Sequence, residues 1–112
     1  MTKDLYKVGS NFIVGLSGIE LKDGEANKLA ALQPAGVVLF RNNIDSDSRC
    51  WPDTLITLIA DVRAAIGREL LLVAIDHEGG LVHRLPKEAT HFPAAANWPE
   101  RSYEVGAAMG RE

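Results

Sequence analysis

Apolar residues occur along this chain in two kinds of pattern, and their order predicts an α/β fold. Three short apolar stretches are typical of β-strands: residues 12–14, 36–40 and 69–75. The second stretch carries no polar side chain, which favours a strand covered on both faces in a parallel sheet. We expect all three strands to be buried in this way.

Apolar residues at helical spacing lie between these stretches and again after the third one. The first helix is expected to be capped by Asp23 and to stop before Pro34. The second has Pro52 in its first turn and is closed by Gly67. A further helical pattern begins around Val105, after a connection rich in proline and alanine. This alternation predicts right-handed βαβ crossovers and a parallel sheet.

The length of the chain limits what this sheet can be. A parallel sheet of three strands leaves an apolar edge unpaired on either side. A complete (β/α)₈ barrel needs about 250 residues, whereas the chain has 112. The pattern therefore indicates one incomplete domain.

Composition and charge exclude several classes of function. With 12 Lys and Arg against 15 Asp and Glu, the net charge is -3 and no basic block exists to neutralise phosphates, so we expect no nucleic-acid partner. Residues 1–7 mix charged and apolar positions unlike a signal peptide, and no apolar run nears membrane-spanning length. We expect a cytoplasmic, soluble protein with no membrane partner. Cys50, the single cysteine, is expected to be a partly buried spectator at a helix start.

The residues richest in chemistry follow the third strand. In α/β folds ligands bind at the carboxyl ends of the strands, and residues 76–84 occupy that place. Asp76 can accept hydrogen bonds from hydroxyl groups, and Arg84 offers a planar fork of donors. Gly79 and Gly80 allow a sharp turn or the close approach of a ligand. The segment is therefore a candidate site for a polyol.

Two other interpretations of this segment remain open from the residues alone. If Asp76 and Glu78 occupied positions i and i+2 of a strand, they would share a face with their Cα atoms about 6.6 Å apart. Their carboxylates would then be within reach of the separations used by inverting glycosidases. Such pairs more often bind hydroxyls, cap a helix or pair with arginine. His77, Glu78 and His83 could be combined as metal ligands, but no known ligand spacing is present. We expect no metal site and regard both histidines as polar loop residues.

Three segments together resemble a known family. Residues 36–44, 74–84 and 92–95 are similar to a strand, an Asp-x-Glu-Gly-Gly-Arg-Val-x-Arg loop and a Pro-Ala-Ala segment of the family 3 glycoside hydrolases, in their β-N-acetylhexosaminidases. Leu81 stands where the motif has its first arginine. The resemblance implies an α/β fold comprising the first three or so βα units of a parallel (β/α)₈ TIM-like barrel. Residues 1–112 would be the N-terminal, incomplete part of that barrel domain.

The resemblance also implies a function. Asp76 and Arg84 would hold hydroxyls of a terminal sugar, while the nucleophile and the acid/base would lie outside these residues, leaving no catalytic residue here. The whole enzyme would release terminal β-linked N-acetylglucosamine by a retaining mechanism, without metal or organic cofactor. Its substrate would be a muropeptide or oligosaccharide in cell-wall recycling, and no obligate protein partner is expected. Neither Asp76 nor Glu78 matches the family's nucleophile or acid/base, so the resemblance argues against the hypothesis that these two carboxylates are a catalytic pair.

Two rival classes remain. A receiver domain of signalling proteins would use Asp76 as phosphoacceptor, but it needs five strands and an acidic cluster after the first strand. Residues 15–18 at that place read Gly-Leu-Ser-Gly. A non-catalytic sugar-binding module is compatible with Asp76 and Arg84, although the exposed sheet edges disfavour it.

Overall fold

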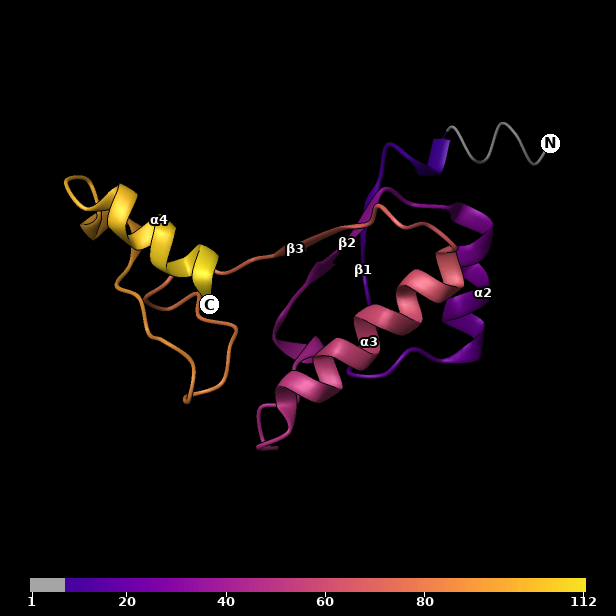
Figure 1. The fold of residues 1–112 in the computed structure, drawn as a ribbon, viewed down its shortest axis with the longest axis horizontal. Coiled ribbons are helices and arrows are strands. Elements are labelled where there is room, and N and C mark those ends of the chain that lie inside the picture. The colour runs from indigo at the N-terminus through magenta and orange to yellow at the C-terminus, as the bar shows by residue number, and fades with distance from the viewer. Residues whose placement is uncertain (1–7) are drawn as a thin grey trace.

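The computed structural model describes residues 8–112, which form three successive βα units (Figure 1). The elements in chain order are β1 (Ile13–Gly15), α2 (Asp23–Leu32), β2 (Gly36–Leu39), α3 (Trp51–Ile66), β3 (Leu72–Ile75) and α4 (Ser102–Arg111). Two short 3₁₀ turns, Arg41–Asn43 and Ala95–Asn97, interrupt the connections. The strands are parallel in the order β1-β2-β3. The predicted α/β class and parallel open sheet are thus confirmed.

The ends of α2 differ in one detail from the sequence-based expectation. Lys22 is the N-cap residue and Asp23 is already helical, with no side-chain capping hydrogen bond, so the prediction that Asp23 caps the helix is wrong. Its carboxylate still lies in the first turn, where it interacts favourably with the helix dipole. Gln33 ends the helix in a left-handed conformation, φ 55°, immediately before Pro34.

Helix α3 has both predicted boundary features. Pro52 lies in the first turn, where a missing N–H costs nothing. Gly67 ends the helix at φ 73° and its N–H donates to the Arg63 carbonyl. Cys50 is the N-cap residue, as expected for a helix start, but it is exposed rather than partly buried.

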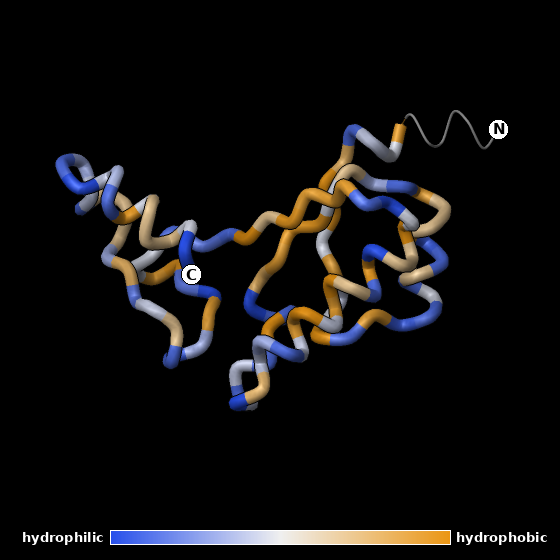
Figure 2. The backbone as a smooth tube through the Cα atoms, viewed as in Figure 1, coloured by the Kyte–Doolittle hydropathy of each residue, from blue (hydrophilic) through white to orange (hydrophobic). Residues whose placement is uncertain are grey.

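One face of the sheet packs against α2 and α3. Val37 and Leu39 of β2 point into this layer and are almost fully buried. The core around them contains Leu16, Leu29, Leu58, Val62 and Ile66. Figure 2 shows the hydrophobic backbone segments gathered along the strands and the inner sides of these helices.

Burial on both faces was predicted for all three strands, and only β2 comes near it, with Gly36, Val37 and Leu39 buried and Val38 partly buried. Ile13 of β1 is 49% exposed and Leu72 of β3 is 60% exposed, so the prediction is wrong for the outer strands. Both residues pair with Gly36 in the register, which places them on one face of the sheet. Within residues 8–112 no second layer covers that face.

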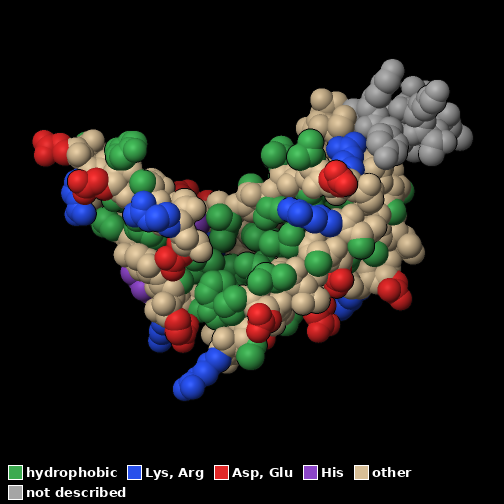
Figure 3. All heavy atoms as spheres, in the orientation of Figure 1, with side chains coloured by type: hydrophobic (Ala, Val, Ile, Leu, Met, Phe, Trp, Pro, Cys, Tyr) green, Lys and Arg blue, Asp and Glu red, His purple; other side chains and the backbone are tan. Residues whose placement is uncertain are grey.

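Helix α4 does not join the layer of α2 and α3. It lies beyond the carboxyl end of β3, on the far side of an extended segment (Figure 1). The radius of gyration is 15.8 Å, whereas a compact domain of this length has about 13 Å. Between α4 and α3 the surface is hollowed and lined by hydrophobic side chains (Figure 3). None of the described helices combines the length and the apolar character needed to cross a membrane.

Candidate sugar-binding site at the end of β3

The carboxyl ends of β1 and β2 are tied together by one buried side chain. Asn43 is 0% exposed and its Nδ2 donates to the carbonyls of Leu16 and Gly18, at 3.1 and 2.9 Å. Its Oδ1 accepts the Phe40 N–H at 2.9 Å. All three partners lie just past a strand, so Asn43 fixes the edge of the sheet at which parallel strands present their ligands.

The loop after β3 begins with a tight glycine turn. Gly79 and Gly80 have φ of 81° and 58°, and Gly79 pairs with Val82 in an isolated antiparallel bridge. A Cβ on Gly79 would overlap the Pro93 carbonyl oxygen, and the Gly80 N–H donates to the Phe92 carbonyl at 2.8 Å. The predicted sharp turn is therefore present. The close approach that the glycines allow here is to the proline-containing segment of the same chain.

This turn brings Asp76 and Arg84 together. Arg84 Nη2 lies 3.1 Å from Asp76 Oδ2, and its Nε donates to the Asp76 carbonyl at 3.0 Å. The side chain of Asp76 remains 38% exposed and that of Arg84 25% exposed. Among the described residues, Asp76 Oδ1 and Arg84 Nη1 have no hydrogen-bond partner. The pair can therefore offer one acceptor and one donor to a hydroxylated ligand without breaking its own contact.

Asp76 and Glu78 do not have the geometry assumed for a carboxylate pair. Strand β3 ends at Ile75, so both acids follow the strand and do not share a strand face. Glu78 is exposed, and its backbone N–H donates to the Val82 carbonyl at 2.9 Å. The premise that strand geometry holds these carboxylates at a catalytic separation is therefore wrong.

His77 and His83 lie in loop segments, as expected, but His83 is buried. His83 is only 8% exposed and stacks on His91, with ring centroids 4.0 Å apart and planes at 14°. The ring of His77 lies 4.6 Å from that of His83, and its Nδ1 accepts the Arg84 N–H at 3.1 Å. The Nε2 of His77 and both ring nitrogens of His83 are buried without a hydrogen bond. The turn at Gly79 and Gly80 brings His83 against His91, and this stacking contributes to its burial.

Burial and mutual repulsion favour the neutral form of both rings. Burial lowers the pKa of His77, and the neighbouring His83 lowers it further, while Glu112 opposes the shift. The pKa of His83 is also lowered, by burial first and then by His91 and Arg41. The Pro86 carbonyl raises the pKa of His83 and partly offsets the lowering. The contact between this carbonyl and the ring does not meet the geometry of a hydrogen bond. No group of three His, Cys, Asp or Glu side chains within residues 8–112 is arranged to hold a metal ion.

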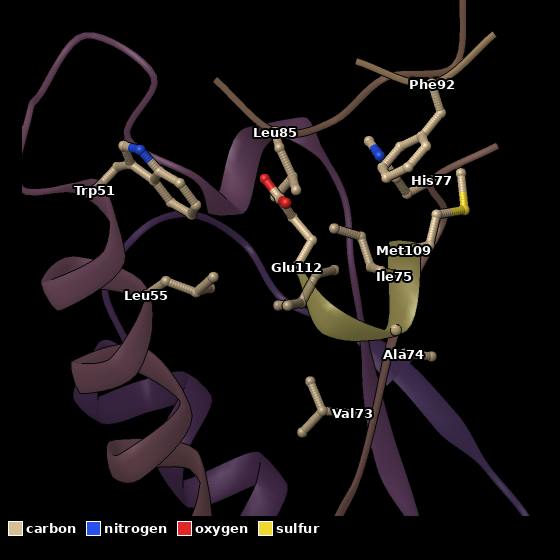
Figure 4. Close-up of a pocket in the computed structure, with 12 residues that line it drawn as sticks. Trp51, Leu55, Val73, Ala74, Ile75, His77, Leu85, Phe92, Met109 and Glu112 are labelled. Carbon is tan, nitrogen blue, oxygen red and sulfur yellow. The ribbon is translucent and has the colours of Figure 1, made fainter. Parts of the chain in front are cut away.

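The hollow between α3 and α4 is a poor match for a sugar. It has a volume of about 470 Å³, and Figure 4 shows apolar side chains of α3, β3 and α4 around it. Its ionisable side chains are those of His77 and Glu112. Glu112 accepts hydrogen bonds from the Thr90 backbone N–H and hydroxyl, which lower the pKa of its carboxyl. A polyol would find few partners here, so the ion pair of Asp76 and Arg84 remains the candidate site.

Comparison with known proteins identifies relatives in sequence. The chain is 36% identical over 100 residues to a beta-hexosaminidase of Thioalkalivibrio sulfidiphilus, a match covering 89% of this chain and 27% of that protein. It is 37% identical over 91 residues to a beta-hexosaminidase of Psychromonas ingrahamii, covering 80% and 25% of the two proteins. The chain thus spans about a quarter of the length of these curated relatives. No family model matches it.

Solved structures agree with these relatives. A glycoside hydrolase family 3 beta-N-acetylglucosaminidase from Paenibacillus sp. str. FPU-7 superposes with a TM-score of 0.66 at 28% identity, over 80% of this chain and 16% of that one. NagZ from Neisseria gonorrhoeae, solved in complex with N-trifluoroacetyl-D-glucosamine, gives 0.62 at 28% identity, over 88% of this chain and 28% of that one. The chain is a homologue of the family 3 beta-hexosaminidases. Its open sheet aligns with part of their (β/α)₈ barrel.

The similarity to beta-hexosaminidases confirms the family resemblance seen in the sequence. These comparisons do not support the alternative of a receiver domain. Sequence reasoning missed Asn43 and His91 as parts of the site's framework. A signal for Asn43 existed, because a polar residue just after a buried strand stands where strand ends are joined. For His91 the signal was weaker: all 3 histidines of the chain fall within residues 77–91.

Proposed function

We propose that residues 1–112 form the N-terminal, incomplete part of a family 3 barrel domain. We further propose that the whole enzyme removes terminal β-linked N-acetylglucosamine from muropeptides or oligosaccharides by a retaining double displacement in peptidoglycan recycling. The observation that carries the proposal is the ion pair of Asp76 and Arg84 at the carboxyl end of β3. The homology to beta-hexosaminidases supports the reaction class.

In this proposal Asp76 and Arg84 position the sugar and take no part in bond cleavage. Asp76 Oδ1 would accept a hydrogen bond from one hydroxyl, and Arg84 Nη1 would donate to a neighbouring one. Their mutual contact orients both side chains before the ligand arrives, which lowers the entropic cost of binding. A complex of NagZ with a glucosamine derivative, N-trifluoroacetyl-D-glucosamine, supports a sugar as the ligand class.

The proposal predicts different behaviour for the chain alone and for a completed barrel. We expect no turnover of a chromogenic β-N-acetylglucosaminide by the 112-residue chain, since the proposal places the nucleophile outside it. Fusion to the remaining barrel of a related beta-hexosaminidase should give turnover. The measurement is release of the chromophore by both proteins at equal concentration.

The carboxylate-pair mechanism makes the opposite prediction. Turnover by the chain alone that is lost in both Asp76→Ala and Glu78→Ala would restore that mechanism and contradict our assignment. A folded fusion without activity would remove the support for a hexosaminidase barrel.

A further inference from the structure

A polar hollow adjoins the candidate sugar site. It has a volume of about 570 Å³ and is formed by the segment after β2 and by residues 80–91. This volume is in the range of roughly 300–1,000 Å³ that is typical of ligand pockets. Arg84 belongs both to the wall of this hollow and to the ion pair with Asp76. A sugar held by that pair would therefore have the hollow as the space for the next part of its molecule.

The charges around this hollow balance. Besides Arg84, two cationic and two anionic residues line it: Arg41, Lys87, Asp47 and Glu88. The charge of Arg84 is offset by Asp76. Histidines are largely neutral above about pH 7, so the lining has no net charge there. A ligand that carries a carboxylate gains no net attraction from such a lining, whereas an uncharged ligand loses nothing.

Leu81 presents an apolar side chain in this lining. It is 97% exposed, the highest value among the large hydrophobic residues that the structure describes. The turn that carries it is fixed by the bridge between Gly79 and Val82, whose backbone N–H groups donate to each other's carbonyls at 3.2 Å. A leucine side chain has no donor or acceptor, so it binds a ligand only by covering apolar groups such as the C–H face of a sugar ring.

An arginine at this place would change the charge of the hollow. The family motif has an arginine where this chain has Leu81, and a guanidinium there would make the lining net positive. We infer that Leu81 determines specificity for the aglycone, the group released with the terminal sugar, in the completed enzyme. Together with the balanced charges, it favours an uncharged oligosaccharide over a muropeptide that bears carboxylates. The inference rests on the proposed function and selects between the two substrate classes named there.

Two disaccharides with the same terminal sugar test this inference in the fusion enzyme. One is N,N′-diacetylchitobiose, which is uncharged, and the other is N-acetylglucosamine β-linked to N-acetylmuramic acid, which carries a lactyl carboxylate. The measured quantity is the ratio of kcat/KM for the uncharged disaccharide to kcat/KM for the acidic one. Leu81→Arg should lower this ratio by about fivefold at low ionic strength, because it adds attraction for the carboxylate. Most of that effect should vanish in about 0.5 M sodium chloride.

Two further variants serve as controls. Leu70→Arg is matched to Leu81→Arg, because Leu70 is 90% exposed and precedes β3, at the end of the strand opposite the site. It adds the same charge and should leave the ratio unchanged. Leu81→Gln removes the apolar contact without adding a charge, so it should lower kcat/KM for both disaccharides by about two- to threefold and keep their ratio constant.

Failure of the inference and failure of the proposed function give different results. An active fusion in which Leu81→Arg leaves the ratio unchanged, or in which both arginine variants change it equally, would overturn the inference and leave the proposed function intact. A fusion that does not cleave the chromogenic β-N-acetylglucosaminide would remove the proposed function, and the role of Leu81 with it.

Discussion

His77 and His83 couple the stability of the loop to pH. Because their pKa values are lowered from 6.5 in the folded chain, by burial first, the unfolded chain takes up protons at a higher pH than the folded one. Their stabilising contribution is complete above about pH 6.5 and is lost as the pH falls through the unfolded-state pKa towards the lower folded-state values. We therefore expect the urea midpoint to drop between about pH 7.5 and about pH 5.

The His83→Phe variant is the control for this titration. It should show a shallower dependence on pH, because of the two rings with a lowered pKa only His77 remains. The lowered pKa of Glu112 acts below its ordinary value of 4.5 and does not interfere with the histidine range. A midpoint that stays constant or rises with acidification would contradict the lowered pKa values of His77 and His83.

Asn43 and Asn42 are adjacent residues with very different expected roles in stability. Asn43→Ala removes three hydrogen bonds and leaves buried backbone groups at the ends of β1 and β2 without partners. We expect a loss of roughly 2–3 kcal/mol in the free energy of unfolding. Asn42 is exposed and donates one hydrogen bond of 3.3 Å to Ser17, so Asn42→Ala should cost less than about 0.5 kcal/mol. Equal losses in urea denaturation would remove Asn43 from this role.

The candidate site was predictable where local geometry decides it. A strand end, a double glycine and an arginine eight residues after Asp76 suffice to bring the ion pair together. The burial of His83 was not predictable, because it depends on packing against the rings of His77 and His91. Local pattern carries no information about which loop segments pack on each other.

The glycine turn after β3 controls the placement of Asp76 and Arg84. Gly79→Ala introduces a Cβ at φ 81° that overlaps the Pro93 carbonyl, so we expect destabilisation by about 1–3 kcal/mol. Gly24→Ala is the matched control, because it lies in α2 with no atom near its added Cβ and should stabilise by roughly 0.5–1 kcal/mol. Thermal denaturation of both variants checks this, and a tolerated Gly79→Ala would show that the turn is not constrained.

Element order and type followed from the sequence more reliably than burial did. The apolar run of β2 correctly indicated the most buried strand, because β2 is central and has a strand on either side. Similar runs in β1 and β3 indicated the same, yet these strands lie at the edges of the sheet. Whether an apolar residue is covered depends on neighbouring elements, which its own segment does not specify.

The whole molecule exposes more apolar surface than a compact domain does. Strand β3 pairs with β2 on one side and has no partner strand on its outer edge within residues 8–112. Its Leu72, Val73 and Ile75 are 60, 39 and 40% exposed. An exposed apolar edge favours pairing between copies, so we expect concentration-dependent self-association in sedimentation velocity. Leu72→Lys should reduce it, whereas Leu70→Lys, 90% exposed and outside the strand, should reduce it less. A sharp monomer boundary at all concentrations, with a cooperative thermal transition, would contradict this expectation.

The central claim is that Asp76 positions a sugar in the completed barrel, and steady-state kinetics with added azide test it most directly. In the fusion enzyme, Asp76→Ala should lower kcat/KM by about tenfold or more, since a charge-assisted hydrogen bond to the substrate is lost. Glu78→Gln is the control and should act mainly through the yield of folded protein.

Azide distinguishes a positioning residue from a nucleophile, because it can replace a missing nucleophile but not a missing hydrogen bond. We predict that azide does not restore activity to Asp76→Ala. Recovery of activity with azide, or kinetics of Asp76→Ala equal to those of the parent fusion, would contradict the role assigned to Asp76.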